Sequence, residues 1–132
     1  MNITYKSSKN FNSFELQNLF KSVNWLSANY PERLEKAINH SSTAISAWDG
    51  EQLIGLVNAL DDSAMTAYVH YLLVNPHYQG QGIGKELIRR IKNRYEGYLY
   101  LLILAEEKDK VSFYTQLGFE VTSSTPLMIM TK

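Results

Sequence analysis

Apolar residues along the chain switch between a period of two, which is typical of strands, and a period near 3.6, which is typical of helices. Residues 2–7 alternate apolar and polar side chains, which predicts an edge strand. Helical spacing begins after Asn12, which Glu15 follows three positions later in the pattern of a capping box. It begins again at Pro31, a residue favoured in the first turn of a helix. The opening part of the chain therefore predicts one strand and two helices.

The middle of the chain predicts three strands. Two apolar runs, residues 43–48 and 52–60, flank the Asp-Gly pair at 49–50. Asp-Gly between apolar runs is a strong signal for a tight hairpin. Residues 65–74 form a third apolar run, which ends just before Pro76. Because proline has no N–H group to continue a ladder, we expect the strand to end there.

The second half predicts a helix, a strand, a short helix and two closing strands. The helix covers residues 82–95, and the nearly continuous apolar run at 98–105 is typical of a strand covered on both faces. A short helix follows at 109–117, and the last two strands are expected at 118–123 and 126–131. The buried face of the first of these helices is expected to carry Ile83, Leu87, Ile88 and Ile91. The predicted class is α/β with a mixed sheet, in the order β-α-α-β-β-β-α-β-α-β-β.

Composition narrows the class of protein. A chain of 132 residues with 45% hydrophobic content suits one domain, residues 1–132, with one core. Thirteen basic residues balance thirteen acidic ones, so no nucleic acid or anionic membrane is implied as a partner. The chain has no cysteine, which excludes disulfides, thiolate metal sites and cysteine nucleophiles. It shows no apolar run near the roughly 20 residues of a membrane span and no signal-peptide core. We therefore expect a cytoplasmic protein.

Three glycines stand at alternate positions in the stretch "QGQGIGK", residues 79–85, between a predicted strand and a predicted helix. Glycine allows positive φ and lets a ligand approach the backbone, and a helix N-terminus offers N–H groups to an anion. The stretch lacks P-loop spacing, and in the dinucleotide fingerprint the third glycine would fall on Lys85 or Leu87. A phosphate site and a plain glycine-rich connection both remain open.

Gln79, Gly82 and Gly84 fit a third phosphate motif, Q/R-x-x-G-x-G/A. With "FYTQLGFE" at residues 113–120 and the order of elements, the chain resembles the GNAT superfamily of acyl-CoA-dependent N-acetyltransferases along nearly its whole length. The resemblance implies the GNAT fold, with a splay between the two central strands. It also implies transfer of an acetyl group from acetyl-CoA to a primary amine of a small molecule, peptide or protein.

The resemblance also implies where acetyl-CoA would bind. The pyrophosphate would lie on backbone N–H groups of the glycine loop, and pantetheine would pair with the free backbone of the preceding strand. Lys85 would add charge toward a phosphate, unless it is a solvated lysine. No metal is implied. One departure from the family pattern is that Glu107 and Lys110 stand where many members carry Asn and a small residue. The cofactor-binding residues implied are Leu72, Leu73, Val74, Gln79, Gly80, Gln81, Gly82, Ile83, Gly84 and Lys85.

Two side chains are candidates for proton transfer. Tyr114 matches the family tyrosine that protonates the leaving thiolate, and this acid role is favoured over that of an aromatic that packs beneath the ligand. A period of two along residues 66–74 places His70 on one face with Tyr68 and Leu72, which makes it a candidate base. Alternatives for the base are a water chain or the carboxylates after the next strand. Those carboxylates belong to Glu106 and Glu107.

Other interpretations stay open at this stage. A non-catalytic acyl-CoA-binding module would keep the glycine loop, and a nucleotide-dependent oxidoreductase is a further alternative. The acceptor amine is not identified, and a homodimer is possible. Asp61 and Asp62 could attract a cationic amine, but turn residues are the first choice. Trp25 and Tyr30 could wall an acceptor pocket, although packing is the simpler role for Trp25.

Overall fold

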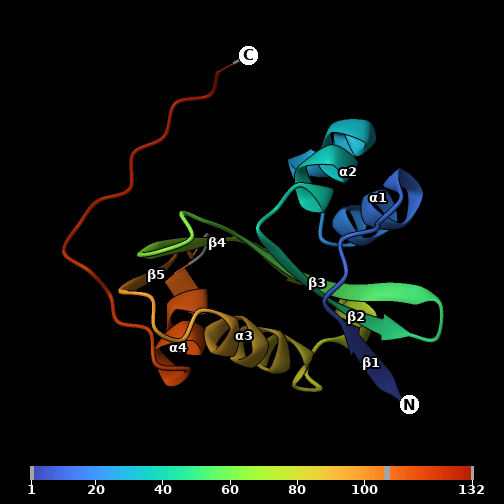
Figure 1. Ribbon diagram of the computed structural model, residues 1–132. Coiled ribbons are helices and arrows are strands. Elements are labelled where there is room, and N and C mark those ends of the chain that lie inside the picture. Colours follow the sequence, from blue (N-terminus) through green and yellow to red (C-terminus); the bar gives the residue numbers. More distant parts are fainter. Residues whose placement is uncertain (1, 106–107, 132) are drawn as a thin grey trace.

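A computed structural model describes residues 2–105 and 108–131 of the chain (Figure 1). Over these residues, no helix has both the length and the apolar character needed to cross a membrane. The elements follow one another as β1 (Ile3–Lys6), α1 (Ser13–Ser22), the 3₁₀ helix η1 (Leu26–Asn29), α2 (Pro31–Asn39), β2 (Thr43–Asp49), β3 (Gln52–Asp61), β4 (Thr66–Val74), the 3₁₀ helix η2 (Pro76–Tyr78), α3 (Ile83–Arg94), β5 (Tyr100–Ile103) and α4 (Lys108–Gln116).

Local signals in the sequence fix several of these boundaries. Asn12 caps α1 in the predicted capping box: its Oδ1 accepts from the N–H of Glu15 at 2.8 Å, and Oε2 of Glu15 accepts from the N–H of Asn12 at 2.9 Å. Pro31 opens α2 as expected. Gly50 turns the hairpin between β2 and β3 with a φ of +60°, a conformation that glycine adopts without strain. These three predictions are confirmed.

The five strands form one mixed sheet in the order β1-β2-β3-β4-β5. The first four pair antiparallel, and β5 runs parallel to β4. Helices α1 and α2 cover one face, and α3 and α4 lie against the other (Figure 1). Each face has its own buried cluster: one gathers Leu16, Phe20 and Leu73, and the other gathers Val69 and the apolar side of α3. The predicted mixed α/β class is confirmed.

A β-bulge in β4 breaks the alternation of its side chains. Leu72 pairs with Val57, and Val69 pairs with Ala59, so two residues of β4 stand opposite the single residue Asn58 of β3. Val69 therefore packs on the α3 face of the sheet, whereas Leu73, an even number of residues later, packs on the α1 face. The bulge reverses the direction in which the second half of β4 presents its side chains.

The Asn58 side chain holds the bulge together. It is 2% exposed, and its Oδ1 accepts from the N–H of Tyr71 at 2.8 Å while its Nδ2 donates to Oγ of Ser41 at 2.9 Å. The carboxamide thus bonds a backbone group that the bulge displaces from the regular ladder. A buried N–H group without a partner would be costly.

Beyond the bulge, β4 and β5 separate. Their parallel pairing runs from Thr66 opposite Tyr100 to Val69 opposite Ile103, and β4 continues to Val74 without a further described partner on that side. Successive residues of a strand direct their backbone groups to opposite edges. Part of the β4 backbone after Val69 therefore faces the gap, as expected for the splay.

The structure corrects two expectations about the end of the chain. The strands expected at 118–123 and 126–131 are not formed, and residues 119–131 are extended without regular structure. The strand expected at 98–105 is shorter, and only one of its faces is covered: Leu101 and Ile103 pack toward α3, while Tyr100 and Leu102 are exposed. Apolar spacing gave residues 118–131 strand character, but no described strand pairs with them.

We predict that Asn58→Ala destabilises the fold by about 1–3 kcal/mol, the usual cost of leaving a buried hydrogen-bonding group without its partner. Chemical denaturation followed by circular dichroism measures this change. Asn18→Ala makes the same chemical change at an exposed position of α1, and its effect should stay within about 0.5 kcal/mol. Equal effects of the two substitutions would show that Asn58 does not hold the bulge.

Candidate active site

The glycine loop leads directly into the N-terminus of α3. Gly80 and Gly82 have φ values of +80° and +83°, and a Cβ added at either would meet no atom within 4 Å. The first hydrogen bond of the helix runs from the N–H of Glu86 to the carbonyl of Gly82 at 3.0 Å. The N–H groups of residues 83–85 therefore have no acceptor within the helix. The loop combines open space with donors and the positive end of a helix dipole, which suits an anion.

Gly84 has a different environment. A Cβ there would lie 3.6 Å from Cζ of Phe113 and 3.9 Å from Cγ2 of Val74, which are ordinary contact distances. Gly84 lies where the end of β4, the start of α3 and the helix α4 meet. Its small size brings these three elements together next to the loop.

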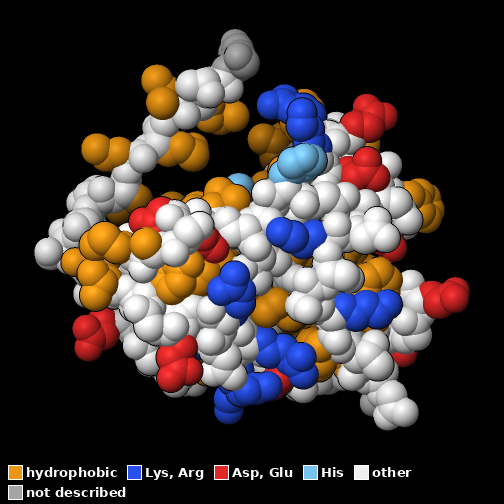
Figure 2. All heavy atoms as spheres, viewed as in Figure 1, with side chains coloured by type: hydrophobic (Ala, Val, Ile, Leu, Met, Phe, Trp, Pro, Cys, Tyr) orange, Lys and Arg blue, Asp and Glu red, His pale blue; other side chains and the backbone are white. Residues whose placement is uncertain are grey.

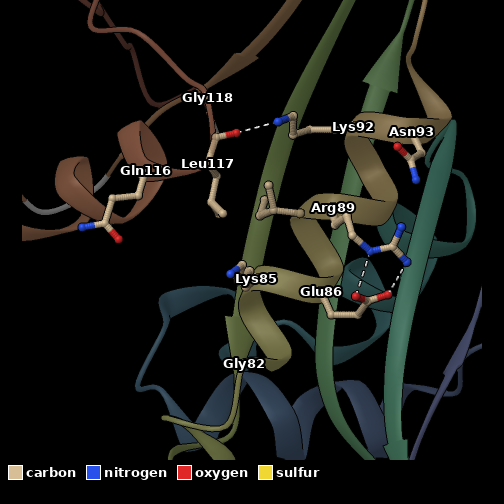
Figure 3. Close-up of a pocket in the computed structure, with 10 residues that line it drawn as sticks. Gly82, Lys85, Glu86, Arg89, Lys92, Asn93, Gln116, Leu117 and Gly118 are labelled. Carbon is tan, nitrogen blue, oxygen red and sulfur yellow. Dashed lines mark hydrogen bonds and ion pairs between the residues drawn. The ribbon is translucent and has the colours of Figure 1, made fainter.

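A groove of about 520 Å³ runs from Gly82 along α3 to α4. In Figure 3, Lys85 and Lys92 project from α3 toward α4, and Gln116 at the end of α4 and Leu117 just after it lie across the groove. Nζ of Lys92 donates to the carbonyl of Leu117 at 2.6 Å, which ties the end of α4 to α3. Gly82 lines this groove, so the groove continues from the candidate anion site.

The charged side chains of α3 are mostly cationic. Its sequence, IGKELIRRIKNR, carries five Lys or Arg residues against one Glu, and Figure 2 shows basic side chains over this helix. Glu86 is ion-paired with Arg89 at 2.6 Å and with Arg90 at 2.7 Å. Hydrogen bonds from Arg89 and then from Arg90 lower the pKa of Glu86 to about 2. The single carboxylate is thus paired with neighbouring cations, and the charged residues that line the groove are three cations and one anion.

The end of β4 and the loop are joined by a side chain. Nε2 of Gln79 donates to the carbonyl of Val74 at 2.9 Å. This contact gives Gln79 a role in shaping the loop, and it engages one of the backbone groups expected for pantetheine. Leu72 and Val74 pack on the α3 face, whereas Leu73 is buried on the α1 face.

Tyr114 lies on the same side of the sheet as Leu72 and Val74. It is half-buried on α4 and packs edge-on against Phe113, with ring centroids 5.1 Å apart, and against Phe119 at 5.9 Å. The turn after α4 is bonded to the backbone of Tyr114: the N–H groups of Leu117 and Phe119 donate to the Tyr114 carbonyl at 3.0 and 3.1 Å. The turn thus holds the backbone at Tyr114, and its ring packs within the cluster on the α3 face.

His70 lies on the opposite side of the sheet. Its ring stacks on Tyr71, with centroids 4.0 Å apart, and lies 5.6 Å from the ring of Tyr68. Tyr71 belongs to the α1 cluster, where it packs on Phe20 and Trp25. The prediction that His70 shares a face with Tyr68 is confirmed. The prediction that it shares a face with Leu72 is wrong, because the bulge intervenes between them.

Several other predicted residues have structural roles. Oδ1 of Asp62 accepts from the N–H groups of Ala64, Met65 and Thr66, contacts that lower its pKa, so it shapes the turn after β3. Oδ2 of Asp61 accepts from the hydroxyl of Tyr95 at 2.7 Å.

Trp25 packs in the α1 cluster, as the simpler interpretation expected. Glu106 and Glu107 lie outside the described residues. In the described part of the chain, no cluster of three or more His, Asp or Glu side chains is suited to a metal ion.

Sequence patterns missed two contacts that shape this region. The bulge contact between Asn58 and Tyr71 joins residues 13 positions apart. The second contact, 2.7 Å between Oγ of Ser27 and the hydroxyl of Tyr71, joins residues 44 positions apart. A polar residue within the apolar run at 52–60 was the only signal for the first, and a lone serine gave none for the second.

The family model, the solved structure and the relatives that this chain resembles are all described as acetyltransferases. Residues 10–127 match the family described as the acetyltransferase (GNAT) domain. A GNAT-family acetyltransferase from Streptococcus pneumoniae superposes with a TM-score of 0.86 at 27% identity, covering 99% of both chains.

Two relatives are similar in sequence. The uncharacterized N-acetyltransferase ycf52 of Porphyra purpurea is 31% identical over 118 residues, 86% of this chain and 67% of its own length. The histone acetyltransferase TAP1 of Glycine max is 32% identical over 129 residues, 89% of this chain but 56% of its own length. The chain thus spans about two thirds of the first relative and about half of the second.

Proposed function

The chain belongs to the GNAT family of acetyltransferases, and from that premise we propose that it transfers an acetyl group from acetyl-CoA to a primary amine. The observation that carries the proposal is the alignment of three features: the open glycine loop, the basic groove along α3, and the gap between β4 and β5. The names of the two relatives support an N-acetyltransferase, and one of them is a histone acetyltransferase. The acceptor would be a small molecule, a peptide or a protein amine.

The loop and groove fit the charged part of acetyl-CoA. The N–H groups of residues 83–85 and the positive-φ backbone at Gly80 and Gly82 would hold the pyrophosphate, with Gln81 and Lys85 at its sides. The rest of the nucleotide would follow the groove toward α4. Leu72, Leu73 and Val74 would offer backbone groups to pantetheine in the gap, although the Val74 carbonyl already accepts from Gln79.

The gap would place the two candidate proton-transfer groups on opposite sides of one site. Acetyl-CoA supplies an activated acyl group and a thiolate leaving group. Tyr114, on the α3 face, would donate its hydroxyl proton to the departing sulfur. His70, on the α1 face, would take the proton of the attacking amine. The amine would then approach from the α1 face of the sheet, and the thiol would leave on the α3 face.

A backbone N–H of β4 beside the gap would stabilise the negative charge that develops on the acyl oxygen. The Tyr71 N–H is engaged by Asn58 at 2.8 Å, so the donor would come from another residue of this stretch. The rings of Tyr68 and Tyr71 on either side of His70 would form an aromatic wall of the acceptor site. A cytoplasmic location, and the expectation that neither nucleic acid nor membrane is a partner, stay predictions from the sequence.

We predict that acetyl-CoA raises the melting temperature of the parent protein by mass action and that NAD does not. Gly82→Val would place a branched side chain in the space proposed for the pyrophosphate, and it should abolish this shift in a thermal-shift assay. Gly50→Val is the matched control, because Gly50 also has a positive φ and open space for a Cβ. The two variants should share the cost of backbone strain, but only Gly82→Val should lose the acetyl-CoA shift. If Gly82→Val still binds acetyl-CoA as the parent does, the loop assignment is overturned.

Tyr114→Phe should lower turnover about 10²–10⁴-fold, the usual contribution of a general acid. The ring and its packing on Phe113 and Phe119 remain, so the acetyl-CoA thermal shift should be unchanged. Turnover is measured as CoA release with an acceptor found by screening an amine library. Full activity of the variant would leave Tyr114 as a packing residue, and a parent that binds acetyl-CoA but acetylates no amine would favour a non-catalytic binding module.

His70→Gln should remove one limb of the pH profile. If His70 is the base, kcat/KM of the parent rises with pH through about 6–7, where an ordinary histidine titrates. In the variant only the ionisation of the acceptor amine should remain, and acetyl-CoA affinity should be kept. If this limb persists in the variant at parental rates, the proton acceptor would instead be a water chain, Glu106 or Glu107.

A further inference from the structure

The tip of the β2–β3 hairpin is bonded to the residue that leads into the glycine loop. The hydroxyl of Tyr78, the last residue of η2, donates to Oδ2 of Asp49, the last residue of β2, at 2.6 Å. We call this contact the hairpin link. Its length is typical of a hydroxyl that donates to an ionised carboxylate, a pair that is stronger than a hydrogen bond between neutral groups. The link therefore ties together two segments that lie 29 positions apart in the chain.

Both partners of the hairpin link are half-buried. The ring of Tyr78 packs against the buried cluster on the α3 face of the sheet. The hydrogen bond to Asp49, and then partial burial, raise the pKa of Tyr78, so its hydroxyl keeps its proton and remains the donor at neutral pH. The ring and the hydroxyl together fix the chain at the entrance to the loop.

The loop itself has few contacts that would hold it. Residues 79–82 are all exposed, and a Cβ added at Gly80 or Gly82 would meet no atom within 4 Å. Glycine also has the largest conformational freedom of any residue. A segment with few buried contacts opens locally at little cost. The order of the loop therefore depends on Tyr78 before it and Ile83 after it.

The residue after the loop rests on the same hairpin. Ile83 is buried, and a Cβ added at Gly55 of β3 would lie 3.3 Å from Cγ2 of Ile83 and 3.4 Å from Cδ1 of Leu87. The absence of a side chain at Gly55 thus lets the first turn of α3 approach the hairpin closely. One hairpin holds both ends of the exposed loop, by a hydrogen bond before it and by close packing after it.

We propose that the β2–β3 hairpin positions the glycine loop, and that Tyr78 and Asp49 are positioning residues for the binding of acetyl-CoA. The inference rests on the proposed function, which assigns acetyl-CoA to the loop. The hydroxyl of Tyr78 is already engaged by Asp49, so the pair acts through the loop rather than by contact with the cofactor. Without the link, only a fraction of the molecules would present the loop in its binding conformation. The apparent dissociation constant would then rise in inverse proportion to that fraction.

The sign of the effect at Asp49 separates positioning from simple charge. Acetyl-CoA is an anion, and a nearby carboxylate repels it. By charge alone, removal of the Asp49 carboxylate would therefore strengthen acetyl-CoA binding. The hairpin link predicts the opposite result, because its loss releases the loop.

Tyr78→Phe keeps the ring and removes only the hydroxyl. We expect the Kd of acetyl-CoA, measured by isothermal titration calorimetry, to rise about 3–10-fold, within the range set by the loss of one hydrogen bond to a charged group. This is a weakening, in contrast to the loss of binding expected of Gly82→Val. The matched control is Tyr95→Phe, because the Tyr95 hydroxyl donates to Oδ2 of Asp61 at 2.7 Å beyond the opposite end of α3. Tyr95→Phe should lower the melting temperature and leave the Kd of acetyl-CoA at the parental value.

A double-variant cycle tests whether the two side chains act as one unit. Asp49→Ala should raise the Kd by the same factor as Tyr78→Phe, and the double variant should raise it no further, because each change removes the same bond. Asp49→Asn keeps an oxygen that can accept from Tyr78, so it should recover part of the affinity. Effects that multiply in the double variant would overturn the link.

Steady-state kinetics supplies a readout that general destabilisation would not give. With a good acceptor, Tyr78→Phe should raise the KM for acetyl-CoA by the same factor as the Kd, and kcat at saturating acetyl-CoA should equal that of the parent. A parent that binds acetyl-CoA, together with a Tyr78→Phe variant that binds it as tightly, would overturn the positioning role alone. A parent that does not bind acetyl-CoA would overturn the proposed function and this inference with it.

Discussion

The bulge in β4 is the constraint on which the candidate site depends. Asn58 stands opposite two residues of β4 and bonds the N–H of Tyr71 at 2.8 Å. One inserted residue reverses the faces of every side chain that follows. Leu72 and Val74 consequently lie with α3, while His70 remains with Tyr71 on the α1 face. A regular strand would have placed His70, Leu72 and Val74 on a single face.

The separation of β4 from β5 turns this reversal into a site. Pairing ends at Val69 and Ile103, just before the bulge, so the sheet opens where its side chains change direction. The proposed acid Tyr114 lies on the α3 side of the sheet, and the proposed base His70 lies on the α1 side. The candidate anion site lies at the far end of β4, where Gly82 precedes α3. A single strand thus positions the proposed phosphate site, the proposed thioester site and the proposed base.

The C-terminal side of the sheet shows the opposite situation, an unfinished edge. β2, β3 and β4 bury apolar side chains on both faces of the sheet, whereas Tyr100 and Leu102 of β5 remain exposed. Leu127, Met128, Ile129 and Met130, near the end of the chain, are exposed as well.

The sequence by itself determined the elements whose signals are local. The Asn12–Glu15 capping box, Pro31, the hairpin at Gly50 and the loop before α3 depend on neighbouring residues, and all appear as predicted. The mixed α/β class and the GNAT family followed from the order of these elements and the loop motif. Only the tertiary structure decided the bulge, because Asn58 and Tyr71 meet across 13 residues and a period of two cannot reveal an inserted residue. It also decided that residues 119–131 form no strand in a single copy, since strand formation requires a partner edge that spacing along the chain does not specify.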